Sequence, residues 1–95
     1  MYAKKTTVIN KSGLHARPAS LFVREAKKYA SDITITKLDK EGNSVNGGSA
    51  KSISRIMALM LTKGTRIEIS AQGEDEQTAV DCLTALVDAG LNESG

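Results

Sequence analysis

Apolar and polar side chains follow one another along this chain in two distinct patterns. Short runs that alternate or are rich in β-branched residues predict strands, and longer segments with apolar residues at three- and four-residue steps predict helices. The strands are expected at residues 2–9, 33–38, 44–45 and 65–71. The helices are expected at residues 16–29, 52–61 and 74–90. The glycine-rich residues 46–50 are expected to form a flexible loop.

The first and third expected helices each carry one apolar stripe that can cover a sheet. In the first helix the stripe consists of Ala19, Phe22, Val23, Ala26 and Ala30. In the third helix it consists of Ala79, Val80, Leu83, Leu86 and Val87. Cys82 is expected to belong to the third helix as a small hydrophobic residue and not as a reactive thiol.

The order of these elements, β-α-β-β-α-β-α, predicts the fold class. Two split strand–helix–strand units with short connections favour a four-stranded antiparallel sheet covered on one face by three helices. The expected fold is therefore an α+β open-faced β-sandwich. The chain has 95 residues, a length that fits one small domain over residues 1–95.

Composition and charge exclude several classes of protein. The net charge of +2 is too small to indicate a nucleic-acid partner. A single cysteine cannot form an internal disulfide, which fits a reducing compartment. Residues 1–5 lead into no apolar signal segment, and no apolar run approaches the roughly 20 residues that span a bilayer. We therefore expect a cytoplasmic protein without membrane insertion.

The candidate chemistry lies in residues 12–20, which contain the histidine and the proline that occur once each in the chain. His15 follows a strand-like run and precedes a helix-like run, so it is expected at a strand-to-helix turn. Gly13 gives the backbone freedom that such a turn needs. Pro18 fits the first helical turn, where its missing N–H group has no consequence.

A histidine at this position is suited to phosphoryl chemistry. The first N–H groups of a helix lack partners within the helix and bind anions. The neutral imidazole of His15 is a competent nucleophile near pH 7. The backbone N–H groups of Ala16 and Arg17, together with the Arg17 guanidinium, are expected to hold the phosphoryl oxygens. The alternative is that His15 is simply a surface histidine beside a helix cap.

The stretch Gly13-Leu14-His15-Ala16-Arg17-Pro18-Ala19 resembles the phosphorylation-site motif of the HPr family, the histidine-containing phosphocarriers of the bacterial phosphotransferase system. The similarity extends along nearly the whole chain. It includes Lys51-Ser52-Ile53, the run from Gly64 to Ala71, and Gly73-Glu74-Asp75-Glu76. The serine segment resembles that of the low-GC Gram-positive members.

The resemblance implies a carrier that is a protein substrate and not an enzyme acting on a small molecule. It implies that His15 accepts phosphate through Nδ1 from enzyme I and passes it to sugar-specific IIA proteins, with Arg17 as the phosphate ligand. It also implies that Ser52 is a regulatory serine, the target of a kinase/phosphorylase whose product assists a catabolite-control repressor. The family's apolar docking surface corresponds to Ile53, Met57 and Leu61. We expect a monomer.

The second expected helix is more apolar than one stripe requires. Its apolar residues, from Ile53 to Leu61, spread over roughly 200° of the helical wheel at about 100° per residue. We therefore expect part of the set Ile53, Met57 and Leu61 to remain exposed as a partner site. Ser52 at the start of this helix fits an N-cap serine, a phosphorylation site, or both.

The chain departs from the family pattern in two places. Residues 37–50 are about six residues longer than the pattern, partly in a hairpin and partly in the following loop, and loop insertions of this kind destabilise little. Ser54 stands where the family usually has a larger apolar residue, which affects the expected docking surface.

Three other functions are compatible with a small α+β chain. A nitrogen-related paralogue of HPr keeps the His15 motif, but the Lys51-Ser52-Ile53 segment argues against it. A generic RNA- or metal-binding module is disfavoured, because the aromatic residues are Tyr2, Phe22 and Tyr29 alone and paired cysteines are absent. A regulatory homologue without carrier activity would replace His15. The sequence therefore indicates no nucleic acid, metal or cofactor.

Overall fold

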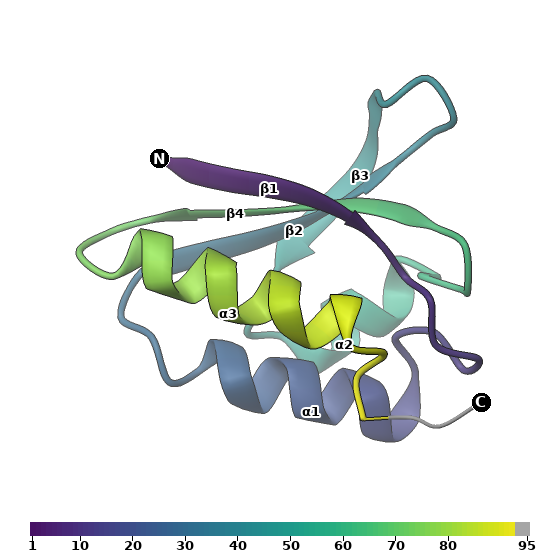
Figure 1. Cartoon of the computed structure of the whole chain (residues 1–95), viewed down its shortest axis with the longest axis horizontal. Coiled ribbons are helices and arrows are strands. Elements are labelled where there is room, and N and C mark those ends of the chain that lie inside the picture. Colours follow the sequence, from purple (N-terminus) through teal and green to yellow (C-terminus); the bar gives the residue numbers. More distant parts are fainter. Residues whose placement is uncertain (93–95) are drawn as a thin grey trace.

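The structure, a computed structural model, describes residues 1–92 and consists of a four-stranded sheet and three helices (Figure 1). The strands are β1 (Tyr2–Thr7), β2 (Asp32–Leu38), β3 (Ser44–Ser49) and β4 (Arg66–Gln72). The helices are α1 (Ala16–Ala26), α2 (Ile53–Ala58) and α3 (Glu76–Asp88). Neighbouring strands in the order β1-β4-β2-β3 are all antiparallel, and the helices lie on one side of the sheet. The predicted open-faced β-sandwich is confirmed.

The core lies between the sheet and the helices. Ile35 on β2 is paired with Ile69 on β4, and both are fully buried because alternate residues of each strand face the helices. Phe22 from α1 and Leu83 from α3 are fully buried against this face. Of the predicted stripes, Ala30 is exposed because α1 ends at Ala26. Leu86 is only half-buried.

Strand β3 is longer than the sequence pattern predicts. Residues 46–49 are not a flexible loop, because Gly47 and Gly48 pair with Thr36 and Ile35 of β2. Gly48 is needed there because a Cβ atom at this position would overlap the side-chain stem of Arg55. Gly48 therefore lets Arg55 of α2 pack closely on an edge strand, which the sequence pattern alone does not reveal.

Two other segments differ from the sequence prediction. Helix α2 ends at Ala58 instead of continuing to Leu61, and Met60 has a left-handed backbone with φ 57°. Cys82 belongs to α3 as expected, but it lies on the exposed face of that helix and is not packed in the core.

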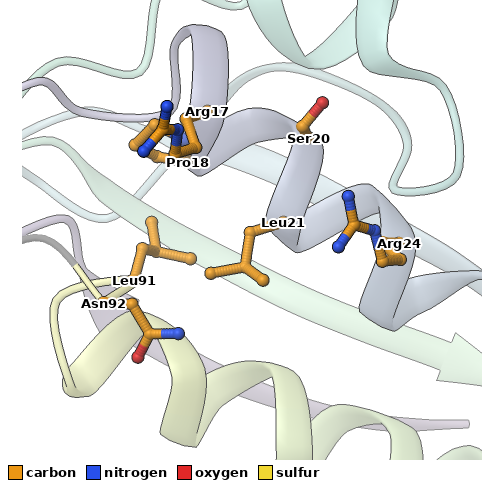
Figure 2. A pocket seen from close by; sticks show the side chains of 7 residues that line it. All are labelled: Arg17, Pro18, Ser20, Leu21, Arg24, Leu91 and Asn92. Carbon is orange, nitrogen blue, oxygen red and sulfur yellow. The ribbon is translucent and has the colours of Figure 1, made fainter.

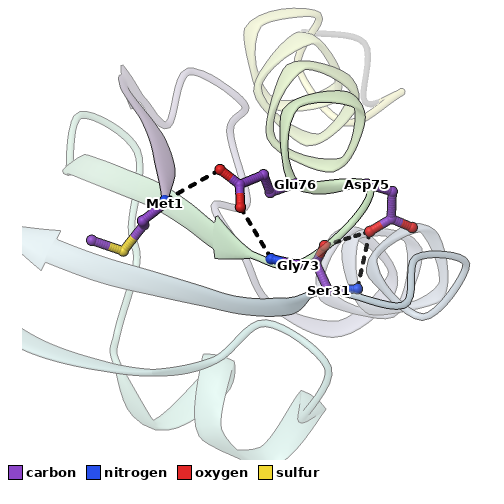
Figure 3. Close-up of polar contacts among 5 residues, drawn as sticks. All are labelled: Met1, Ser31, Gly73, Asp75 and Glu76. Carbon is purple, nitrogen blue, oxygen red and sulfur yellow. Dashed lines mark hydrogen bonds and ion pairs between the residues drawn. The ribbon is translucent and has the colours of Figure 1, made fainter.

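Two carboxylates join the ends of several elements at the start of α3 (Figure 3). Asp75 accepts hydrogen bonds from the backbone N–H groups of Ala30 (2.9 Å) and Ser31 (3.0 Å) and from the Ser31 hydroxyl. Glu76 accepts one from the N–H group of Gly73 (3.1 Å) and pairs with the amino terminus at 3.3 Å. The Ser31 hydroxyl and these backbone donors lower the pKa of the Asp75 carboxyl from its ordinary value, and the Gly73 N–H group lowers the pKa of Glu76 in the same way.

We predict that the fold becomes less stable as the pH is lowered, in part because the Asp75 carboxylate becomes protonated. A carboxylate whose pKa is lowered in the folded state stabilises the fold above its ordinary pKa, and this contribution is lost as the pH falls through the lowered value. Asp75→Asn should therefore unfold at lower urea concentration at pH 7 and lose less stability between pH 5 and pH 3. The control Glu74→Gln, one residue earlier, should keep the wild-type pH dependence. An unchanged pH dependence in Asp75→Asn would contradict this role.

Candidate functional site

His15 lies at the start of α1, as its sequence position predicts. It is the N-cap residue, with extended backbone angles (φ −123°, ψ 156°), and its carbonyl accepts the N–H group of Ala19 at 3.4 Å. The half-buried imidazole makes no capping hydrogen bond and has no hydrogen-bond partner among residues 1–92. Neither ring nitrogen is therefore engaged by another residue of the described chain.

The two residues that follow His15 have backbone N–H groups without a backbone acceptor in the described chain. The N–H groups of Ala16 and Arg17 open the helix and have no backbone acceptor within residues 1–92, and the first turn carries no acidic residue. Helix α1 begins at Ala16, so Arg17 and Pro18 both lie in the first turn. Ala16 has φ 48°, a left-handed conformation that is strained for a residue with a Cβ atom. These features make the helix start suited to an anion.

The loop before His15 is fixed by the segment that follows α2. Gly13 and Asn10 exchange hydrogen bonds, and the N–H group of Leu14 donates to the carbonyl of Leu61 at 2.9 Å. Gly13 has φ 66°, and a Cβ atom there would overlap the Leu61 carbonyl oxygen and lie 2.9 Å from the Cα atom of Thr62. Gly13 is therefore required both for its backbone conformation and for this close approach.

Arg17 is exposed and forms no ion pair within the described chain. It lines an open cavity of about 620 Å³ between α1 and the residues after α3 (Figure 2). Figure 2 shows Arg17 and Arg24 at the two ends of this cavity, with Leu21 between them and Leu91 and Asn92 opposite. Arg24 was not among the predicted site residues, although its position seven residues after Arg17 places both on one side of the helix, about 10 Å apart along its axis.

Ser52 is the N-cap of α2. Its hydroxyl accepts the N–H group of Arg55 at 3.3 Å and lies 3.3 Å from the hydroxyl of Ser54. The N-cap interpretation of Ser52 is therefore confirmed. The side chain is half-buried at the end of the helix, next to Ile53.

Two of the three residues of the expected docking surface are exposed. Ile53 is 40% exposed and Met57 is 39% exposed, but Leu61 is fully buried. The prediction for Leu61 is wrong because α2 ends before it and the left-handed backbone at Met60 turns the chain, so that Leu61 points inward and Met60 is exposed by 58%. We name Ile53, Met57 and Met60 the apolar patch.

The apolar patch adjoins basic residues of α1. Ile53 lines a groove of about 290 Å³ together with Val23, Arg24 and Lys27 of α1. An apolar centre with a basic edge is the arrangement that a partly acidic protein surface can cover.

Comparisons with known proteins agree with this geometry. Residues 2–89 match the family model PTS-HPr, described as the PTS HPr component phosphorylation site. The chain belongs to the HPr family. It is 48% identical over 87 residues to the phosphocarrier protein HPr of Haemophilus influenzae, covering 92% of this chain and 95% of that protein. It is 47% identical to the HPr-like protein Crh of Bacillus subtilis, with the same two coverages.

Solved HPr structures have the same fold. HPr-C-His from Thermoanaerobacter tengcongensis superposes with a TM-score of 0.84 at 38% identity, covering all of both chains. The Mycoplasma histidine-containing phosphocarrier protein superposes with a TM-score of 0.80 at 35% identity, covering 95% of this chain and 97% of that one. The chain is thus a phosphocarrier of the phosphotransferase system by family.

Within residues 1–92, no three His, Cys, Asp or Glu side chains lie close enough together to hold a metal ion. In the same part of the chain, no helix has the length and apolar character needed to cross a membrane.

We predict that Gly13→Ala destabilises this HPr-family fold by about 2 kcal/mol or more, because it combines left-handed strain with an overlap on the Leu61 carbonyl. Gly64→Ala is the matched control, since Gly64 has φ 92° but open space where a Cβ atom would lie. Gly64→Ala should lower the free energy of unfolding only by the cost of the left-handed backbone, about 1 kcal/mol. Urea unfolding of both variants measures the difference, and equal losses would show that the contact with Leu61 contributes nothing.

Proposed function

We propose that this chain carries a phosphoryl group on His15, receiving it from enzyme I and passing it to IIA proteins. The observation that supports this most is the free imidazole at the start of α1, next to the unpaired N–H groups of Ala16 and Arg17. A relay needs a nucleophile that is reachable by two large partners in turn. An N-cap histidine on an exposed helix end meets that need.

The transfer step is a displacement at phosphorus. The lone pair of a neutral His15 nitrogen, Nδ1 in the family, attacks the phosphorus atom of a phosphohistidine on enzyme I. The new N–P bond forms as the old one breaks, and the bonding electron pair returns to the donor imidazole. Arg17 and the helix N–H groups stabilise the charge on the three phosphoryl oxygens, so positioning and electrostatics supply most of the catalysis. In the transfer to a IIA protein, a histidine nitrogen of the IIA protein attacks the same phosphorus atom. The N–P bond to His15 then breaks, and its electron pair returns to the His15 imidazole.

The apolar patch and the basic edge of α1 are the proposed docking surface for both partners. Exposed methionine side chains adapt to different surfaces, which suits a carrier that binds several proteins one after another. Arg24 and Lys27 favour acidic partners and speed the encounter. Each partner must leave after transfer, so we expect the carrier to act as a monomer that forms short-lived complexes.

Ser52 is the proposed regulatory site, modified by a kinase/phosphorylase and read by a catabolite-control repressor. A phosphate there would add about two negative charges at the end of α2, directly beside Ile53 and the basic groove. The helix N-terminus tolerates an anion, so the fold would persist. The acidic partners of the apolar patch would meet like charge, and their affinity would fall.

We predict that enzyme I and radiolabelled phosphoenolpyruvate label this chain in an acid-labile form. His15→Ala should abolish the label, and Arg17→Ala should slow labelling by roughly tenfold to a hundredfold because one charged oxygen ligand is lost. Lys5→Ala, on the opposite face of the sheet, is the control and should label at the wild-type rate. Labelling that survives in His15→Ala would overturn the proposed carrier function.

We predict that Ser52→Asp raises the KM of enzyme I for this chain by roughly fivefold to tenfold through like-charge repulsion, with little change in kcat. Ser44→Asp, exposed on β3, is the control and should leave the KM unchanged. Urea unfolding should show both variants folded. Equal KM values for the wild type and Ser52→Asp would remove the regulatory role proposed for Ser52.

A further inference from the structure

The hairpin formed by β2 and β3 carries an exposed apolar side chain that the core does not explain. The register of the two strands shifts between Lys37 and Leu38, so Val45 has no paired residue opposite it. Val45 is 59% exposed. Leu38 beside it is buried but does not belong to the central core cluster. An irregularity of this kind turns a side chain away from the regular sheet, and such positions are often near binding sites.

Basic side chains surround this valine. Lys37, Lys40 and Arg66 line an open depression of about 360 Å³ together with Leu38 and Val45. None of the three cations forms an ion pair within residues 1–92.

One carboxylate, that of Asp39, also lines the depression. Its Oδ1 atom accepts the N–H groups of Glu41 (3.0 Å) and Asn43 (2.8 Å), which closes the hairpin turn. The carboxylate is thereby engaged by the backbone, and the lining retains an excess of positive charge. Five of the eight residues that line the depression belong to residues 37–50, the segment expected to be longer than the family pattern, and the other three are Gly64, Thr65 and Arg66.

We propose that this depression is a second docking surface, which binds an acidic segment of a partner protein through one aliphatic side chain. The aliphatic group would cover Val45 and Leu38, and flanking carboxylates would reach Lys37, Lys40 and Arg66. The surface shares no residue with the apolar patch or with the His15 site, so a partner bound at the hairpin leaves both free. The proposal does not depend on the proposed carrier function.

The character of the depression favours this occupant over two others. A second copy of the chain would bring a positively charged depression of the same kind against this one, and the chain as a whole has a net charge of +2. A single-stranded nucleic acid would need aromatic side chains for base stacking, and none lines the depression. An acidic segment with an exposed leucine or isoleucine matches both the apolar floor and the cations.

The test is an NMR titration of the ¹⁵N-labelled full chain with a short peptide that has leucine between two pairs of aspartates. The amide signals that shift should be those of Leu38, Val45 and Thr65. Raising the salt concentration from 50 to 500 mM should weaken binding by at least about threefold. A peptide with asparagine in place of aspartate, or with glycine in place of leucine, should bind more weakly.

Substitutions locate the site independently. Val45→Asn should weaken binding of the aspartate–leucine peptide by about threefold to tenfold, and Lys40→Gln by about twofold to fivefold. Met60→Asn is the matched control because Met60 is exposed to nearly the same degree as Val45, 58% against 59%, but lies in the apolar patch. It should bind the peptide as the wild type does, and unchanged signal dispersion shows that all three variants are folded.

Three results would overturn the proposal. One is equal affinity for the asparagine peptide. Another is a loss of affinity in Met60→Asn with none in Val45→Asn, which would place the peptide on the apolar patch. The third is tighter binding of an oligothymidylate than of the peptide, insensitive to Val45→Asn, which would assign the depression to nucleic acid.

Discussion

The close approach of Gly13 to the carbonyl of Leu61 is the contact on which the site depends. It joins the loop before His15 to the segment after α2, two parts of the chain separated by almost fifty residues, through the hydrogen bond from Leu14 to Leu61. Because this contact needs a residue without a side chain, it fixes Gly13 as firmly as any core position. The loop that leads into α1 and the segment that follows Met60 are thereby joined directly.

The start of α1 combines two features that are unfavourable by themselves. Ala16 is in a left-handed conformation, and the N–H groups beside it have no protein acceptor. An anion bound at this point would supply the missing acceptors, and the exposed Arg17 would add a charge-assisted hydrogen bond. The start of α1 can thus accommodate the oxygens of a phosphoryl group, which is consistent with the proposed carrier function.

The described chain presents three candidate surfaces, one of which lies apart from the other two. The proposed phosphoryl site lies at the N-terminal turn of α1, and the proposed docking surface for its partners is the apolar patch with its basic edge on α1. The hairpin depression lies on other residues again. On a domain this small, such separation is possible because the three helices cover one face of the sheet and leave the strand ends and the hairpin exposed. Arg24 lines both the cavity beside Arg17 and the groove beside Ile53, so these two surfaces adjoin, whereas the hairpin depression shares no lining residue with either.

The sequence by itself determined the order of the elements, the position of His15 just before a helix, and that of Arg17 and Pro18 in the first turn, because these depend on interactions between residues near each other in the chain. It also placed Ser52 at a helix start. The tertiary structure alone decided that Leu61 is buried and Met60 exposed, that Gly47 and Gly48 form a strand, and that Arg24 shares a cavity with Arg17. Each of these depends on a contact between distant segments. The Leu61 carbonyl contacts the loop before His15, and the side chain of Arg55 lies over Gly48. The residues after α3 face α1 across the cavity that Arg17 and Arg24 line. The spacing of apolar residues along one helix or strand does not predict such contacts, because it does not depend on which distant segment packs against that element.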